Sequence, residues 1–434
     1  MHLLCLDADV RSALFSGHAF IGMAVCKRLR QDILKFGHIN ARLMLGDNWR
    51  PTVPFLTRFL SSFRYLRTSI HFEHRGVVEV ELLAGVLPLL PSLTSLNLGS
   101  NHLDTLGAEA LALGLCHTKS LTALDIGYNM LGPSGAEHIA RALPCLSQLR
   151  GLCMQGNDFG PSGATHISNF LVHVSALSTL RLGDNAVGHS GAARLADGLR
   201  WLPALTFFDI EGNSLTPITL MSAASDDQSV SKLAESLAFT PALQSLCAGD
   251  NDFGPEAAAV FLGLSLRFTP LLTALDIGYN RLGLEGANAL ALALGYVPHL
   301  AILNVQGNGL GAEGAEALSK GLLNAPRLAS VVLWNNGLGD AGMTAIADGL
   351  RRASHLTSLD LGGNSIGIVG AGKLLEVVQP GLLGLTVLDI RSCFSNFSPS
   401  IVVAVVAFDR QRRVSGLRVN SLGRLFGLIQ TRVW

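Results

Sequence analysis

Acidic residues recur at one regular position in this chain, and their spacing suggests binding chemistry. Asp125, Asp209, Asp276, Asp360 and Asp389 each stand between two apolar residues in a short segment of alternating character. Such alternation is typical of a half-buried strand, which would place the five carboxylates on one exposed face. A row of carboxylates attracts a positively charged partner and guides its approach. The pattern therefore predicts an acidic binding surface.

Further side chains extend this predicted surface. They are Tyr128, Arg181, Asp184, Glu211, Asp250, Tyr279 and Trp334. Aromatic side chains are frequent anchors of protein partners, and we expect Trp334 above all to be exposed and to take this role. The expected partner is a protein with a basic surface.

Catalytic signatures are absent from the sequence. It contains no GxxxxGK phosphate loop followed by Ser or Thr, no HExxH motif and no GxSxG elbow. The 13 histidines are scattered without ligand spacing. The 7 cysteines form no CxxC pair, which argues against a disulfide framework or a zinc site and favours reduced thiols. We therefore expect no enzymatic activity, no cofactor and no metal.

Composition and charge narrow the class further. Of the 434 residues, 49% are hydrophobic and 15% are charged, and the net charge is zero. The apolar content suffices for a large core, and a neutral chain has no overall attraction to nucleic acid. No apolar run reaches the roughly 20 residues of a transmembrane helix, and the first residues do not resemble a signal peptide. With reduced thiols, these features predict a cytoplasmic protein.

The phrase LTALDIGYN occurs at 121–129 and again at 272–280. It belongs to a series of segments of the form L-x-x-L-x-L-x-x-N-x-L, whose asparagines mostly recur every 28 residues. They are Asn101, Asn129, Asn157, Asn185, Asn213, Asn251, Asn280, Asn308, Asn336 and Asn364. The identity of the two copies has two explanations. We favour duplication of a block of five units over a need for two equivalent surface patches.

These units resemble leucine-rich repeats, and their second halves resemble the ribonuclease-inhibitor-like subclass. Those halves follow LGxxGAxALAxGL, as in LGPSGAEHIARAL at 131–143 and LGAEGAEALSKGL at 310–322. Similar repeats occur in NOD-like receptors and in Ran GTPase-activating proteins. The resemblance implies an α/β leucine-rich-repeat solenoid, a horseshoe with parallel strands on its concave face and helices on its convex face. It also offers a second explanation for the aspartates, because Leu-Asp-Leu is a frequent form of this repeat.

The residues predict the same fold independently. Apolar residues after the GxxGA segment follow helical spacing, as at Ala108, Leu111, Ala112 and Leu115. One strand–turn–helix unit cannot bury its own apolar face, so units must stack. Stacked strands lie about 4.8 Å apart whereas stacked helices need about 8–10 Å, so the stack bends with its helices outside. Each asparagine is expected to bond backbone groups of the turn after the strand.

Three segments are predicted along the chain. Residues 1–62 lack the repeat and form an N-terminal helical cap, in which AVCKRLR at 24–30 weakly resembles the end of an F-box. Residues 63–393 hold about 11 units of 28–29 residues, with a degenerate unit around Ile70 and Phe72 and an insertion near 216–230. Residues 394–434 form a C-terminal cap and an arginine-rich tail.

The main functional prediction is a non-enzymatic intracellular module that binds a protein on its concave face. One alternative is an F-box-like substrate receptor of a ubiquitin ligase, with residues 1–40 docking the ligase adaptor. A further alternative is a GTPase-activating protein of the Ran type, although the basic tail differs from the acidic tail of that group. A fragment of an innate sensor is a fourth reading, but the sequence contains no nucleotide-binding domain.

Overall fold

The computed structural model describes residues 41–45, 68–72, 84–85, 87–216, 228–351, 353–381, 385–390 and 418–419. The chain divides into two compact units, Met1–Leu205 (unit 1) and Thr206–Trp434 (unit 2). This boundary falls inside the predicted repeat region 63–393. The F-box-like segment, Cys393, and most of the predicted N-terminal cap, insertion and basic tail lie outside the described residues.

Unit 1 contains a parallel sheet whose strands follow one another in chain order. β2 spans the degenerate unit predicted around Ile70 and Phe72, and β1 adds a strand within the segment predicted as a cap. The strands are β1 (Ala41–Leu45), β2 (Thr68–Phe72), β3 (Leu93–Asn97), β4 (Ala123–Asp125), β5 (Gly151–Cys153) and β6 (Thr179–Arg181). The helices are α5 (Thr105–Leu115), α6 (Gly132–Ala142), α7 (Gly160–Phe170) and α8 (Gly188–Leu199). Short 3-10 segments are η1 (Leu87–Leu89), η2 (Leu143–Cys145) and η3 (Leu171–Val174).

Unit 2 has the same organisation, again with parallel strands in chain order. The strands are β7 (Phe207–Asp209), β8 (Ser245–Cys247), β9 (Ala274–Asp276), β10 (Ile302–Asn304), β11 (Ser330–Val332), β12 (Ser358–Asp360), β13 (Val387–Asp389) and β14 (Arg418–Val419). The helices are α9 (Ser229–Ser236), α10 (Gly254–Phe268), α11 (Gly283–Ala293), α12 (Gly311–Leu322), α13 (Gly339–Leu350) and α14 (Ile368–Gly381), with 3-10 segments η4 (Leu237–Phe239) and η5 (Leu294–Tyr296).

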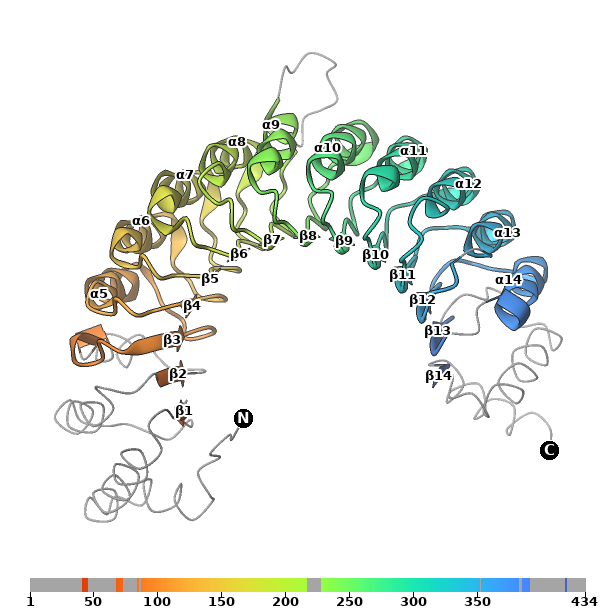
Figure 1. Cartoon of the computed structure of the whole chain (residues 1–434). Helices are drawn as coiled ribbons and strands as arrows, with labels where there is room; N and C mark the ends of the chain where they lie inside the picture. Colours follow the sequence, from red (N-terminus) through yellow and green to blue (C-terminus); the bar gives the residue numbers. More distant parts are fainter. Residues whose placement is uncertain are drawn as a thin grey trace, which may run out of the picture. The chain divides into compact units, whose positions relative to one another are not determined.

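The core of each unit lies between its strands and its helices. The central residue of each strand from β4 to β13 is buried, and the register places equivalent residues side by side, as with Leu275 and Leu303. Ala315 and Leu318 of α12 are buried on the same side, and each buried leucine stabilises the fold by about 1.5–3 kcal/mol. Within each unit the helices lie on the outer, convex side of the strands (Figure 1). This confirms the predicted solenoid of strand–turn–helix units and leaves one strand side exposed.

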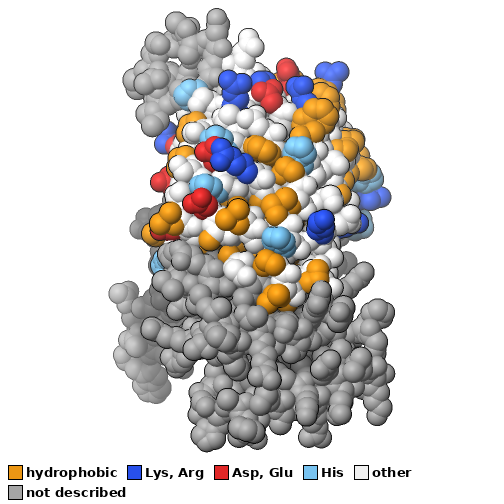
Figure 2. All heavy atoms as spheres, turned by 90° about the vertical axis from the view of Figure 1, so that its left-hand side faces the viewer, with side chains coloured by type: hydrophobic (Ala, Val, Ile, Leu, Met, Phe, Trp, Pro, Cys, Tyr) orange, Lys and Arg blue, Asp and Glu red, His pale blue; other side chains and the backbone are white. Residues whose placement is uncertain are grey.

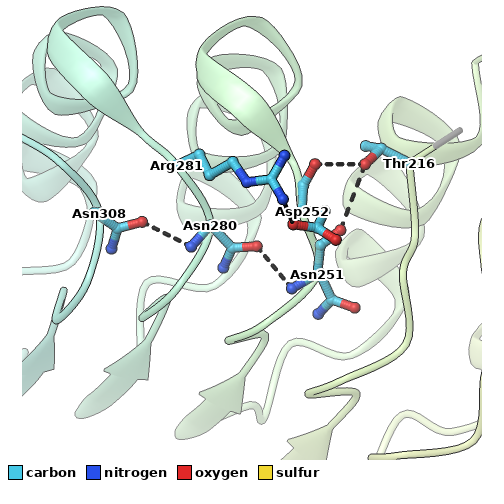
Figure 3. Close-up of polar contacts among 6 residues, drawn as sticks. All are labelled: Thr216, Asn251, Asp252, Asn280, Arg281 and Asn308. Atoms are coloured by element: carbon cyan, nitrogen blue, oxygen red, sulfur yellow. Dashed lines mark hydrogen bonds and ion pairs between the residues drawn. The ribbon is translucent and has the colours of Figure 1, made fainter. Parts of the chain in front are cut away.

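The repeated asparagines are buried and link the turns of neighbouring repeats, as predicted. The Asn280 amide donates to the backbone oxygens of Ala248, Ile277 and Gly278 at 2.8, 3.2 and 3.1 Å. Its Oδ1 accepts the Asn251 N–H at 3.0 Å, and Asn308 accepts the Asn280 N–H in the same way at 2.8 Å (Figure 3). One side chain thus satisfies backbone groups of two successive turns that would otherwise be buried without partners.

The predicted insertion leaves the repeat at a well-anchored residue. Residues 217–227 are outside the described part of the chain, but Thr216 immediately before them is buried. Its hydroxyl donates to the backbone oxygens of Asn251 and Asp252 at 3.4 and 2.6 Å (Figure 3). The insertion therefore begins from a residue that is tied to the following repeat.

The prediction of reduced cysteines is wrong for one pair. Cys116 and Cys145 form a disulfide, with Cα atoms 4.9 Å apart and a sequence separation of 29. They lie just after α5 and α6, at nearly equivalent points of consecutive repeats. Stacking brings residues about one period apart into contact, so a pair can form without the short spacing of a CxxC motif. Cys153 and Cys247 are free thiols.

Candidate protein-binding face

The residues predicted to bind a partner occupy one position of successive strands. In unit 1 the register aligns Asn97, Asp125, Cys153 and Arg181. In unit 2 it aligns Asp209, Cys247, Asp276, Asn304, Val332, Asp360 and Asp389. We call the exposed side of the strands, together with the two residues before each ladder asparagine, the strand face of that unit.

The aspartates of the strand face have a structural role that the sequence did not reveal. Their Oδ1 atoms accept the backbone N–H two residues later, which closes the turn after the strand. These bonds are Asp125 to Gly127 (3.0 Å), Asp209 to Glu211 (3.2 Å), Asp276 to Gly278 (3.0 Å) and Asp360 to Gly362 (2.9 Å). Asn97 and Asn304 make the same bond at 2.9 and 3.0 Å without a charge. At this position an amide oxygen therefore makes the turn bond as well as a carboxylate does.

Cys153 is a strand-face thiol whose acidity is clearly perturbed. Burial raises its pKa from 9.0 to about 12, and the neighbouring Asp125 carboxylate adds to this shift. A thiol with such a pKa stays protonated at neutral pH, and the thiolate is the nucleophilic form. Cys153 is therefore a poor nucleophile and instead donates a hydrogen bond to Asp125.

Two predicted contact residues are less accessible than expected. Trp334, predicted to be the principal exposed anchor, is only partly exposed, and Asp389 is 5% exposed. Asp389 lies on β13, which has a parallel neighbour on each side, β12 and β14. The best exposed aromatic residues of the strand faces are instead Tyr128 (54%) and Tyr279 (41%).

Of the remaining predicted residues, four are exposed, whereas Asp125, Asp209, Asp276 and Asp360 are partly buried. Arg181 and Asp184 are exposed in unit 1, as are Glu211 and Asp250 in unit 2. Ile302, which the sequence analysis did not single out, is 49% exposed on β10. It lies between Ala301 and Leu303 in an apolar stretch, so the sequence gave no signal that it is exposed.

The two strand faces differ in charge. Strands β7–β13 of unit 2 contain four aspartates and neither lysine nor arginine. Strands β3–β6 of unit 1 contain one aspartate and one arginine. The predicted acidic surface is therefore concentrated in unit 2, whereas the strands of unit 1 are balanced.

The helix side offers no comparable single-sign surface in unit 1. Viewed from the left of Figure 1, charged side chains of both signs, histidines and scattered hydrophobic side chains are interspersed (Figure 2). Glu137 and Arg141 of α6 form an ion pair there, and His166 of α7 approaches Glu137 at 4.0 Å. Mixed, locally paired charges produce little long-range attraction for one class of partner.

Two further searches cover only the described part of the chain. No cluster of three or more His, Cys, Asp or Glu side chains in it is arranged to hold a metal ion. None of its helices combines the length and apolar character required to span a membrane.

Comparisons with known proteins identify the repeat. The family model described as "Leucine Rich repeat" matches residues 90–112, 117–140, 270–291, 298–319 and 352–375. A solved structure of the yeast Rad7 and Elc1 complex is 17% identical, with a TM-score of 0.55 over 92% of this chain and 91% of that chain. An internalin (inlF) from Listeria monocytogenes is 18% identical, with a TM-score of 0.48 over 85% of this chain and 93% of that chain. No curated protein matches.

Leucine-rich repeats are thus present in five places, and they fall in both units. The likeness to Rad7 is one of fold. The ribonuclease-inhibitor-like subclass stays a prediction from the LGxxGA segments.

Proposed function

We propose that this leucine-rich-repeat chain is a non-enzymatic module that binds a protein partner on the strand face of unit 2. The observation that carries the proposal is the charge of that face, whose seven strands β7–β13 hold four aspartates and no lysine or arginine. Stacked repeats of this kind expose extended surfaces suited to binding.

The proposed partner is a protein with a basic surface. Because Asn97 and Asn304 close their turns without a charge, the aspartates at the same position carry charge that the turn does not require. Carboxylates repel the phosphates of nucleic acid and attract lysine and arginine side chains. The exposed Tyr279 and Ile302 add apolar contact area. The cytoplasmic location stays a prediction, and the Cys116–Cys145 disulfide removes the reduced-thiol argument for it.

The chemistry of the face supports binding rather than catalysis. Cys153 is protonated at neutral pH because its pKa is raised to about 12. The side-chain oxygens of Asp125 and Asp276 are engaged by turn N–H groups and by the amides of Asn97 (3.2 Å) and Asn304 (2.8 Å). Such groups hold a surface in shape and are poorly placed to accept a substrate proton.

The test removes charge while preserving shape. Asp209→Asn and Asp360→Asn, combined in one full-length variant, keep a side-chain oxygen for the turn. The matched control, Glu313→Gln with Glu316→Gln, removes the same charge from the exposed side of α12. Proteins captured from the native cells by each variant are compared at about 0.1 M and higher salt, where screening shortens to a few ångströms.

A partner that is lost with the strand-face variant and at high salt, but kept by the α12 control, is the expected result. Partners that bind all three proteins equally would refute a role for the strand-face charge.

A second candidate is an adaptor-docking receptor. It is favoured by the fold likeness to Rad7, which was solved in complex with a second protein, Elc1, and by the F-box-like AVCKRLR segment at 24–30. Under this candidate Leu14, Phe15, Phe20, Val25 and Leu29 dock the adaptor. Replacing Phe15 and Leu29 with Ser in the full chain should abolish capture of a ubiquitin-ligase adaptor while leaving capture of the strand-face partner unchanged.

A further inference from the structure

The duplicated LTALDIGYN phrase builds the same surface feature in each unit. Tyr128 and Tyr279 have positive φ values of 53° and 54° and extend over the glycine of the next repeat. A Cβ added to Gly156 would lie 2.6 Å from Tyr128 Cδ1, and one added to Gly307 would lie 2.4 Å from Tyr279 Cδ1. Only glycine leaves room for the ring at these positions. Each unit therefore presents an exposed tyrosine ring resting on a glycine.

The surroundings of the two rings differ in charge. In unit 2, a Cβ on Gly249 would lie 3.3 Å from Asp276 Oδ1 and 3.6 Å from Glu211 Oε1. Two carboxylates from different repeats thus converge on the turn that precedes Tyr279 by one repeat. The residue after Gly249 is the exposed Asp250.

The equivalent turn in unit 1 has one carboxylate among its nearest described neighbours. A Cβ on Gly99 would lie 3.5 Å from Asp125 Oδ1 and 3.4 Å from the neutral Asn97 Oδ1. The residue after Gly99 is Ser100, where unit 2 has Asp250. Within the described part of the chain, Tyr128 and Tyr279 are therefore a matched pair whose preceding turns differ in their acids.

Backbone hydrogen bonds hold the acids and the ring of unit 2 in adjacent turns. The Asp250 N–H donates to Gly278 O at 2.8 Å, and the Tyr279 N–H donates to Gln306 O at 2.7 Å. Adjacent turns continue adjacent strands, which are about 4.8 Å apart. Asp250 and Tyr279 thus belong to neighbouring turns of the same strand face.

An aromatic ring beside carboxylates suits a guanidinium group. Arginine stacks its planar head on aromatic faces and donates hydrogen bonds to carboxylates in the same plane. Strands β7–β13 supply no competing lysine or arginine. Arg281, two residues after Tyr279, is paired with Asp252 at 2.8 Å (Figure 3).

We propose that Tyr279, Glu211, Asp250 and Asp276 form a receiving site for an arginine side chain of the protein partner. Among the described residues, the turn before Tyr128 has Ser100 in place of Asp250, and we do not assign the same site to Tyr128. The inference rests on the proposed function of the strand face of unit 2 and names the partner chemistry that this face selects.

The four tyrosines of the chain provide a direct readout. The full-length protein is labelled with 3-fluorotyrosine, and its ¹⁹F NMR signals are assigned with single Tyr→Phe variants. The probe is an acetylated, amidated peptide of alternating Gly and Arg. The control peptide carries citrulline, which keeps the shape of arginine but has no charge.

The expected result is a shift of the Tyr279 signal with the arginine peptide, no comparable shift of the Tyr128 signal, and no response to citrulline. Glu211→Gln with Asp250→Asn should weaken the arginine response at least about fivefold, because two of the three carboxylates are removed. Asn tolerates the left-handed backbone of Asp250 (φ 51°), so the variant keeps its turn.

Three outcomes would overturn the proposal. They are equal shifts of both tyrosines, an equal response to citrulline, and a Tyr279 signal that already moves, without peptide, when Arg424 and Arg432 are replaced by Gln. The last would mean that the C-terminal segment of this chain occupies the site. If the Asp209→Asn, Asp360→Asn variant loses its partner but the Tyr279 signal of the parent does not respond to the arginine peptide, the arginine site is rejected and the proposed function stands. If that variant still captures the partner, the proposed function is rejected.

Discussion

Replacing Asn280 by Ala should destabilise the fold far more than its small change in volume suggests. Asn280 is 0% exposed and its side chain makes four hydrogen bonds, three as donor and one as acceptor. The three donor contacts share two N–H groups, so the loss amounts to about three net bonds of about 1 kcal/mol each. The buried Asn251 N–H loses its acceptor. We therefore expect a loss of about 3 kcal/mol in the free energy of unfolding.

The matched control is Asn288→Ala, which deletes the same group from an exposed position on α11. It should change stability by less than about 0.5 kcal/mol, because alanine is also the better helix former. Urea denaturation followed by circular dichroism measures both variants, and the slope must match that of the parent protein for midpoints to be compared. An Asn280→Ala midpoint equal to that of Asn288→Ala would refute the view that the asparagines hold adjacent repeats together.

Three other predictions concern the disulfide, one glycine and one thiol. The Cys116–Cys145 disulfide closes a loop with a sequence separation of 29, so its reduction should lower the free energy of unfolding by about 3 kcal/mol. Thiol titration of the denatured protein should find two fewer thiols before reduction than after it. Gly307→Ala should destabilise the fold more than Gly309→Ala, by at least about 1 kcal/mol. Both glycines have positive φ, but only a Cβ at Gly307 would meet the ring of Tyr279 within 4 Å. Equal urea midpoints for the two variants would contradict this. Cys153 should resist alkylation at pH 8 because its pKa is raised to about 12. This folded pKa exceeds the ordinary 9.0. The thiol's contribution to the free energy of unfolding is therefore complete below pH 9 and is lost as the pH rises toward 12. Over that range the parent protein should lose stability relative to the Cys153→Ala variant.

The repeat could be predicted because its signals are local. The alternation of each Leu-x-Leu segment and the 28-residue spacing of the asparagines are visible along the chain. Identical units stack with identical offsets, so the parallel order and the register, as in Asp276 beside Asn304, follow from the period. The buried hydrogen bonding of Asn280 was predictable for the same reason.

Other features depend on contacts between repeats that local patterns do not encode. The Cys116–Cys145 disulfide joins residues that only stacking brings together. Trp334 was predicted from its residue type to be exposed, but it is partly covered. The carboxylate of Asp276 was predicted from its strand position as a binding group, and the structure adds that it also closes its own turn.

By itself, the sequence determined which residues are equivalent, because a fixed period assigns every side chain to the core, the turn or the strand face. The tertiary structure alone decided how far equivalent side chains are exposed. Asp360 and Asp389 occupy the same strand position, yet Asp360 is partly exposed whereas Asp389 is only 5% exposed. The burial of a side chain depends on neighbouring repeats about 4.8 Å away in space, and those neighbours lie at least one period away along the chain.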